Sequence, residues 1–338
     1  MEAGRRRTAR SIAIELTLFA AVAAFAVLFA HWHQTRNMVH PPAALDRLCA
    51  FSAETPYQNR VLVPLVLRAL QESGLGERPG LTLEAGARLI DVVCVIGLFY
   101  TLRALLSRFA VGVWPSILGA ALGLYALPFL YVLPRAWPYW YPWDSPAVLF
   151  TTLGLLWIKD QRWAWYYWIF PFATLNRETT LFLILAFALT QFGRMKWLAY
   201  FQHIGVQIAI WVGIKLLLSR TFARNPGVGE YYADALKENL VSIQDPQMWI
   251  TMSTLFGFLW IPLVLLARHI RDSFARRALL VLPLFFAVSF CLAQCNELRI
   301  YGEMLPLVIL GLACGIVGRD KRSNERATAL SARSPGLP

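Results

Sequence analysis

The sequence predicts an all-α polytopic membrane protein, and three observations support this fold class. Hydrophobic residues make up 57% of the 338 residues and charged residues only 15%, whereas soluble domains average about 25% charged residues. The apolar residues are gathered in runs of the length that crosses a bilayer. The net charge of +12 comes from bases scattered between these runs, a pattern that favours membrane orientation over nucleic-acid binding.

Continuous apolar runs mark most of the expected spans. The first run follows four arginines and has no small-residue cleavage site after it, so we expect an uncleaved span with a cytoplasmic N-terminus. Several later runs are shorter than about 20 residues, and we expect their helices to extend into the flanking polar residues. The expected spans are residues 11–32, 86–106, 111–133, 145–158, 197–218, 250–267, 278–293 and 305–317.

Residues 163–192 break this pattern because polar residues, including Arg177 and Glu178, interrupt their apolar sequence. One helix of this length would reach about 45 Å and carry both charges inside the hydrocarbon. Two short helices, 163–172 and 180–192, avoid this and form a re-entrant-like hairpin with its tip in a protein-lined cavity. With this pair, the sequence predicts about ten transmembrane helices.

The distribution of charges supports this topology. The segments placed in the cytoplasm hold well over half of the 32 Lys and Arg residues but under a third of the 20 Asp and Glu residues. This asymmetry follows the positive-inside rule, so we expect both termini in the cytoplasm. Residues 1–318 are expected to form a single transmembrane domain, and residues 319–338 a disordered cytoplasmic tail.

Two long segments are expected on the outer side. The first outer segment, residues 33–85, contains two short apolar stretches, 41–51 and 60–73, which are interrupted by charges or proline and predict interfacial helices. The second outer loop, residues 220–249, has glycines near its start. No strand precedes these glycines, so a plain turn is favoured over a phosphate-binding loop.

Ionisable residues at depth or on the outer side are the candidates for function, because burying them in a membrane is costly. Each has a structural alternative: a solvated helix face for Asp46, a helix N-cap for Asp144, a structural pair for Arg177 and Glu178, and an interfacial belt for the aromatic run 137–143. The candidates are Asp46, Glu54, Tyr57, Arg60, Trp140, Asp144, Arg177, Glu178, Glu297, Arg299 and Tyr301.

These residue types suit phosphate chemistry. Arginines such as Arg60, Arg177 and Arg299 can hold a phosphate bidentately, and a carboxylate can deprotonate an acceptor hydroxyl. A sugar carried on a lipid phosphate presents its phosphate at this depth. The histidines at 31, 33 and 40 and the five cysteines have no metal-site spacing, so we expect no cofactor and leave a divalent metal open.

The landmarks of the chain resemble those of the integral-membrane GT-C glycosyltransferases, particularly poorly characterised bacterial members. The resemblance covers the long first outer segment, the number of spans and the short hairpin. Its motifs are residues 56–64, Asp144, Asn176-Arg177-Glu178-Thr179 and Glu297-Leu298-Arg299-Ile300-Tyr301. Many members carry paired acids soon after the first span, and this sequence has none there.

The resemblance implies sugar transfer from a polyprenyl-phosphate carrier to an unknown acceptor at the outer face of a bacterial cytoplasmic (inner) membrane. It implies an acidic catalytic residue early in the first outer segment, which falls on Asp46 or Glu54. The expected partners are therefore the lipid bilayer and the lipid-linked donor, with no nucleic acid.

Two alternative functions are also compatible with the sequence. An envelope polysaccharide polymerase or ligase would use the same donors but would need arginine-rich outer loops. A transporter or flippase for a lipid-linked solute would need a pathway to both faces and two related halves. The glycosyltransferase hypothesis instead requires that Asp46, Glu54, Asp144 and Arg177 converge on one cavity.

Overall fold

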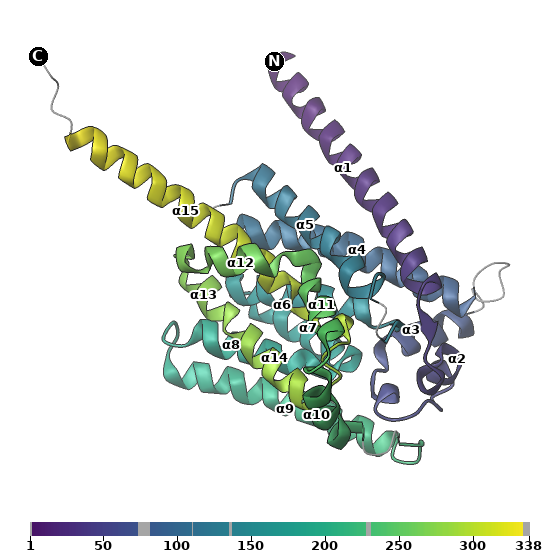
Figure 1. Cartoon of the computed structure of the whole chain (residues 1–338). Helices are drawn as coiled ribbons and strands as arrows, with labels where there is room; N and C mark the ends of the chain where they lie inside the picture. The colour runs from purple at the N-terminus through teal and green to yellow at the C-terminus, as the bar shows by residue number, and fades with distance from the viewer. Residues whose placement is uncertain (1, 74–81, 110, 135–136, 228–230, 334–338) are drawn as a thin grey trace, which may run out of the picture.

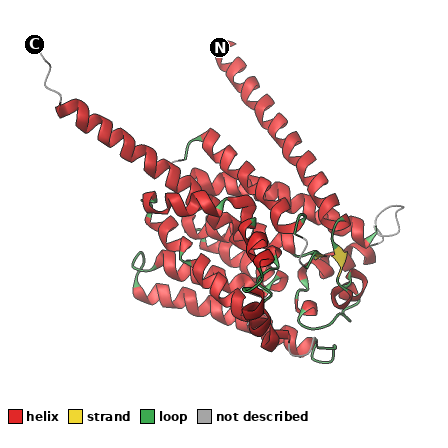
Figure 2. Ribbon diagram, viewed as in Figure 1, coloured by secondary structure: helices red, strands yellow, loops and turns green. Residues whose placement is uncertain are grey.

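The computed structural model is almost entirely helical, with one pair of two-residue strands (Figures 1 and 2). It describes residues 2–73, 82–109, 111–134, 137–227 and 231–333. Within these residues, six helical segments are long and apolar enough to cross a membrane: Ile12–Thr35, Leu83–Ser107, Val113–Tyr131, Trp197–Thr221, Ser273–Leu292 and Leu298–Asp320. The chain is therefore an all-α, multi-pass membrane protein in contact with lipid.

The longest helices form the frame of the bundle, and shorter helices fill in around them (Figure 1). The long ones are α1 (Glu2–Thr35), α4 (Leu83–Ser107), α5 (Val113–Tyr131), α6 (Asp144–Asp160), α9 (Trp197–Thr221) and α15 (Leu305–Arg333). The shorter ones are α2 (Leu45–Cys49), α3 (Leu62–Glu72), α7 (Trp163–Asn176), α8 (Leu181–Gln191), α10 (Tyr231–Ser242), α11 (Pro246–Ser253), α12 (Trp260–Leu266), α13 (Ser273–Leu279) and α14 (Val281–Leu292).

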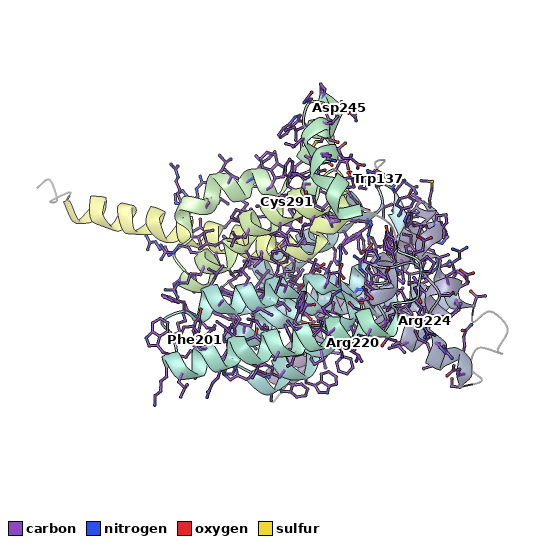
Figure 3. The ribbon with its side chains drawn as sticks, turned by 90° about the horizontal axis from the view of Figure 1, so that it is seen from below. Trp137, Phe201, Arg220, Arg224, Asp245 and Cys291 are labelled. Carbon is purple, nitrogen blue, oxygen red and sulfur yellow. The ribbon has the colours of Figure 1, made fainter. Side chains whose placement is uncertain are left out.

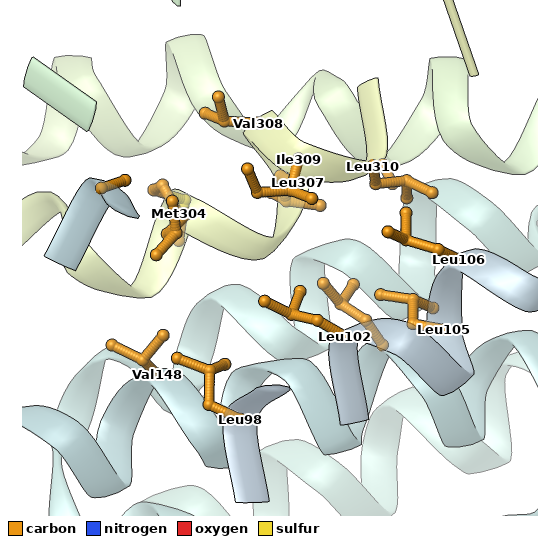
Figure 4. Close-up of a cluster of buried hydrophobic side chains, with 14 of the residues drawn as sticks. Leu98, Leu102, Leu105, Leu106, Val148, Met304, Leu307, Val308, Ile309 and Leu310 are labelled. Carbon is orange, nitrogen blue, oxygen red and sulfur yellow. The ribbon is translucent and has the colours of Figure 1, made fainter. Parts of the chain in front are cut away.

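The core lies where α4 packs against α5, α6 and α15. Leu98, Leu102 and Leu106 of α4 face Leu307 and Ile309 of α15 (Figure 4), and all five are buried. Small residues let α4 and α5 approach closely, as in many membrane bundles. A Cβ atom at position 119 of α5, for example, would lie only 2.5 Å from a methyl carbon of Leu106.

The expected span 250–267 is not one continuous helix. The chain forms α11, the 3₁₀ turn η5 (Leu255–Phe258), α12 and the turn η6 (Ala267–His269). Phe256 and Gly257 have positive φ angles of 54° and 62°, and such residues cannot continue a right-handed helix. The bend also brings the backbone onto α5, since a Cβ at Gly257 would lie 2.8 Å from the ring of Tyr125.

The predicted hairpin is present as α7 and α8, separated by the 3₁₀ turn η4 (Glu178–Thr180). Arg177 has the extended conformation, with φ −160° and ψ 138°, so it ends α7. The sequence placed this end near Pro171, but α7 continues through Pro171 to Asn176. Tyr166 and Phe170, which have no exposed surface, anchor the helix just before the proline.

The first outer segment folds into short helices, as expected, although the stretch 41–51 is divided into η1 (Pro41–Ala43) and α2. After η2 (Tyr57–Asn59), α3 turns Val63 and Leu67 inward and Leu65 and Val66 outward. Strand β1 (Met38–Val39) pairs in parallel with β2 (Tyr139–Trp140), so this segment is tied to the aromatic run.

The segments predicted to face outward gather at one end of the bundle, which we call the outer end. Figure 3 shows Trp137, Arg220 and Arg224 near this end and Phe201 at the opposite end. Asn225 joins the two outer segments by donating to the carbonyl oxygens of Phe51 and Ala53, at 3.1 and 2.8 Å.

The C-terminal segment differs from the expected disordered tail. Helix α15 continues to Arg333, so residues 319–333 are helical, and residues 334–338 lie outside the described residues. The last turns of α15 and the first turns of α1 project from the same side of the bundle (Figure 1).

Candidate functional site

Asp144, at the start of α6, lies at the centre of a buried group of charged side chains. Its side chain has no exposed surface, and its Oδ1 atom lies 3.6 Å from Nη1 of both Arg177 and Arg299. It does not cap α6, because neither of its oxygens accepts a hydrogen bond from the described residues. The Asp144 cluster, as we define it, comprises His33, Asp91, Asp144, Arg177, Glu297, Arg299 and Glu303.

Arg177 reaches Asp144 because the chain is extended between α7 and η4. The preceding residue fixes this bend, since Nδ2 of Asn176 donates to the Trp143 carbonyl oxygen at 3.0 Å. Nη1 of Arg177 also lies 3.2 Å from Oε1 of Glu303, which accepts a 2.5 Å hydrogen bond from Thr179. Arg177 is thus shared between two buried carboxylates rather than paired with its neighbour Glu178.

Arg299 enters the cluster from η7 (Leu298–Met304), the turn that leads into α15. It forms an ion pair with Glu297 and lies above the ring of Tyr141, with its Cζ 3.8 Å from the ring centroid. The guanidinium group therefore has a carboxylate on one edge and an aromatic face beneath it, which favours its charged form inside the protein.

His33 and Asp91 join the cluster from α1 and α4. Nδ1 of His33 donates to Oδ2 of Asp91 at 3.0 Å, and its Nε2 lies 4.0 Å from Oδ2 of Asp144. All three side chains are fully buried. The carboxylate of Asp91 holds the imidazole so that its second nitrogen is directed at Asp144.

A stack of aromatic rings separates the cluster from a second ion pair. Tyr141 stacks on Tyr57 and on Trp143, with centroid separations of 5.8 and 4.8 Å. Arg60 lies over Trp143 at 4.9 Å and pairs with Glu178 at 2.8 Å. Burial raises the pKa of Tyr57, so its hydroxyl stays neutral at physiological pH.

The cluster holds several buried polar atoms that have no hydrogen-bond partner in the described part of the chain. They are Nε2 of His33, both carboxylate oxygens of Asp144, and the Nε and Nη1 atoms of Arg177 and Arg299. Buried polar groups are normally satisfied, and leaving them unpaired is costly. Donors from two arginines beside a carboxylate and an imidazole form a suitable site for an anionic ligand that also carries a hydroxyl group.

Two narrow cavities, each of about 10 Å³, border the cluster. One is lined by Arg299 together with Tyr131 and Trp137 at the outer end. The other is lined by Thr179, Glu303 and apolar side chains of α8 and α15. Each has room for roughly one water-sized sphere, so a larger ligand has to displace side chains as it enters.

The structure brings most of the predicted site residues together. Asp144, Arg177, Glu297 and Arg299 belong to the Asp144 cluster. Tyr57, Arg60 and Glu178 lie along the aromatic stack, and Trp140 packs against His33 with ring centroids 6.4 Å apart.

The remaining predicted residues have other surroundings. Asp46 is exposed on α2, whereas Glu54 is half-buried in the loop before η2. Of the four residues that the glycosyltransferase hypothesis expects at one cavity, only Asp144 and Arg177 pair within the described residues, and Asp46 and Glu54 do not join them. Tyr301 stacks on Phe286, and its hydroxyl donates to the carbonyl oxygen of Cys295 at 3.0 Å. This hydrogen bond is a structural role, because it ties η7 to the end of α14.

Sequence reasoning missed three members of the cluster as site residues. Asp91 is an acid within the apolar run 86–106, and that position alone could have marked it. The sequence marks His33 only as a potential metal ligand, and it assigns no role to Glu303. No group of His, Cys, Asp or Glu within the described residues is arranged to hold a metal ion.

Comparison of the chain with protein-family models, curated proteins and solved structures finds no match. The class that fold and site define is therefore a helical membrane protein with a buried, charged site near one end of its bundle.

Proposed function

We propose that this chain is a membrane glycosyltransferase that moves a sugar from a polyprenyl-phosphate carrier to an acceptor at the outer face of the membrane. The observation that carries the proposal is the convergence of Arg177 and Arg299 on Asp144 in a buried site. Acceptor identity is left open.

The two arginines are proposed to bind the donor phosphate. Their guanidinium groups approach Asp144 from different places, the link between α7 and η4 and the turn η7. Both have Nε and Nη1 atoms without a hydrogen-bond partner in the described residues. Charge-assisted hydrogen bonds from arginine to phosphate are short and strong. Fixed positive charge in a water-excluded site also stabilises the negative charge that develops on a phosphate leaving group.

Asp144 is proposed to act as the general base. The acceptor hydroxyl gives its proton to the Asp144 carboxylate, while the hydroxyl oxygen bonds the anomeric carbon of the sugar. The bond between that carbon and the phosphate oxygen breaks, and its electron pair leaves with polyprenyl phosphate. His33, whose Nε2 lies 4.0 Å from Asp144, can then take the proton from the carboxylate.

The finer features of the topology belong to the same proposal. We place both termini in the cytoplasm of a bacterial inner membrane, following the distribution of bases. The predicted number of about ten transmembrane helices then counts α7 and α8 separately. It counts the broken segment α11–α12 as a single membrane crossing. The exposed Trp137 and the half-buried Tyr139 stand near the outer cavity, where aromatic faces suit a sugar ring or an isoprenoid.

Packing supports an enzyme over a transporter. Along α4, buried Leu98, Leu102 and Leu106 follow Asp91, and along α15 buried Leu307 and Leu310 follow Glu303 (Figure 4). On both helices this apolar layer lies on the side of the charged site away from the outer end. A transporter would need a polar pathway through that region. A polymerase or ligase remains the second candidate, and the nearly balanced charge of the outer segments disfavours it.

The test is transfer of radiolabelled sugar from a polyprenyl-phosphate donor in membranes that contain the full chain. Asp144→Asn and Arg177→Ala should each reduce transfer by about 10²-fold or more, the usual effect of removing a general base or an oxyanion donor. The matched control is Asp234→Asn, which changes an exposed acid on α10.

Asp46→Asn and Glu54→Gln test whether the general base is Asp144 or a residue of the first outer segment. If either abolishes transfer while Asp144→Asn does not, the base lies in the first outer segment and the role of Asp144 is wrong. Wild-type transfer in every variant would overturn the whole site assignment.

A further inference from the structure

A second cavity, of about 360 Å³, lies far from the Asp144 cluster. Small-molecule sites typically have volumes of roughly 300–1,000 Å³. Along α4, Arg108 follows Asp91 by about 25 Å at 1.5 Å per residue, so this cavity is separate from the proposed transfer site. Its lining combines charged and apolar side chains, namely Arg108, Arg271, Asp272, Phe109, Cys314 and Val317.

Three separate elements build the cavity. Arg108 and Phe109 follow α4, Arg271 and Asp272 connect η6 to α13, and Val317 belongs to α15. Two of these elements are packed tightly, because a Cβ atom at position 318 of α15 would meet the His269 carbonyl oxygen of η6. The wall that α15 and η6 form is therefore fixed by backbone packing.

The charges that line the cavity favour an anion. Nε of Arg108 donates to both Asp160 oxygens, at 2.9 and 3.1 Å, and its terminal nitrogens make no hydrogen bond within the described residues. Asp272, the acid in the lining, already has partners for both of its carboxylate oxygens. Oδ1 of Asp272 accepts from the Ala275 amide at 2.9 Å, and its Oδ2 lies 3.5 Å from Nζ of Lys159.

An exposed apolar surface adjoins the charged lining. Helices α12 and α15 lie side by side (Figure 1), with Gly315 in direct contact with Leu266. Val264, Leu265 and Ile316 on these helices are 65%, 68% and 50% exposed. Such side chains suit contact with acyl chains, whereas a site for free phosphate needs no apolar surface.

We propose that this cavity binds the phosphate head group of an anionic phospholipid, with the acyl chains along α12 and α15. Basic pockets between membrane helices bind lipid head groups in this way. Arg108 and Arg271 would contact the phosphate, and Phe109 and Val317 would line the start of the chains.

The test counts lipids that the full chain retains after reconstitution in phosphatidylcholine containing some phosphatidylglycerol, measured by native mass spectrometry. Wild type should retain phosphatidylglycerol selectively, and R108Q/R271Q should lose this selectivity several-fold. V317W, which fills the cavity and keeps every charge, should lose it too. R276Q is the control, because Arg276 is an exposed arginine on α13 outside the lining.

Two results would overturn the proposal. Equal retention by wild type and by both cavity variants would show that the cavity does not select lipid, and equal loss in R276Q would show only diffuse surface charge. A second measurement adds inorganic phosphate to detergent-solubilised protein. Thermal stabilisation by phosphate without selective lipid retention would assign the site to a free anion and reject the lipid.

Discussion

His33 on α1 and Asp91 on α4 form a hydrogen bond of 3.0 Å between two side chains that have no exposed surface. Because a carboxylate can only accept, the imidazole donates through Nδ1, and its second nitrogen, Nε2, faces Asp144. The bond thus joins the first two long helices and orients a titratable group at the centre of the Asp144 cluster.

Removing this acceptor should destabilise the protein. Asp91→Ala leaves the His33 Nδ1 hydrogen buried and unpaired, and we expect a loss of about 1–3 kcal/mol. Thermal unfolding of the detergent-solubilised chain measures it. Asp234→Ala, which removes an exposed acid 3.7 Å from Lys237, should change stability by less than about 0.5 kcal/mol. Equal unfolding midpoints for the two variants would contradict the structural role of Asp91.

Gly302→Ala should disturb the packing of Tyr131 beside the Asp144 cluster. A Cβ atom at this position would lie 1.7 Å from the Tyr131 hydroxyl oxygen and 2.5 Å from its Cζ. The buried tyrosine would have to move, and overpacking of this kind costs about 1–3 kcal/mol.

The control for this substitution is Gly205→Ala in α9. No atom lies within 4 Å of a Cβ placed there, so alanine should be neutral or should stabilise the helix by up to about 1 kcal/mol. The measurement is the unfolding midpoint of each variant. A Gly302→Ala protein as stable as Gly205→Ala would mean that Tyr131 does not occupy the position described.

The Arg60–Glu178 ion pair should contribute more than an exposed pair. Its side chains are 12% and 26% exposed, against 44% and 64% for Arg68 and Glu72 on α3. A double-mutant cycle with Arg60→Gln and Glu178→Gln isolates the pair from the contact between Arg60 and Trp143. We expect a coupling energy of about 1–2 kcal/mol for the half-buried pair and about 0.5 kcal/mol or less for the exposed one. Equal coupling would refute this ranking.

His40 should make stability depend on pH. Its pKa is lowered from 6.5, first by burial and then by the positive charge of Arg299. The unfolded chain therefore takes up a proton at a higher pH than the folded chain. His40 costs no stability above about pH 6.5, and stability falls as the pH drops below that value. Thermal midpoints at about pH 7.5 and pH 5.5 should converge in His40→Gln, whereas an unchanged difference would exclude His40 as the source.

The sequence predicted the continuous helices well because hydropathy is a local property. The expected runs 11–32 and 86–106 agree closely with the apolar helices Ile12–Thr35 and Leu83–Ser107. The bend at Phe256 and Gly257 was not visible, because its positive φ angles are maintained by contacts with α5. An apolar composition is compatible with either a straight or a bent segment.

Only part of the site could be predicted from the sequence. An ionisable residue within or beside an apolar run indicates a candidate, but the run does not show which other residues it contacts. Arg177 and Asp144 were found from their position relative to the spans. The pairing of His33 with Asp91 joins residues far apart in the chain, and one acid hardly changes the hydropathy of a long apolar run. Asp46 stays a prediction from family resemblance, whereas the buried geometry favours Asp144.

The parallel pairing of Met38 with Tyr139 and of Val39 with Trp140 has a consequence for biosynthesis. Strand β1 leaves the ribosome long before β2, with α4 and α5 made in between. In the topology that we propose, the first outer segment therefore crosses the membrane before its partner strand is made. Until then its apolar helices lack the aromatic residues that cover them. This interval is when a translocating chain is open to proteases and to chaperones that protect unpaired segments.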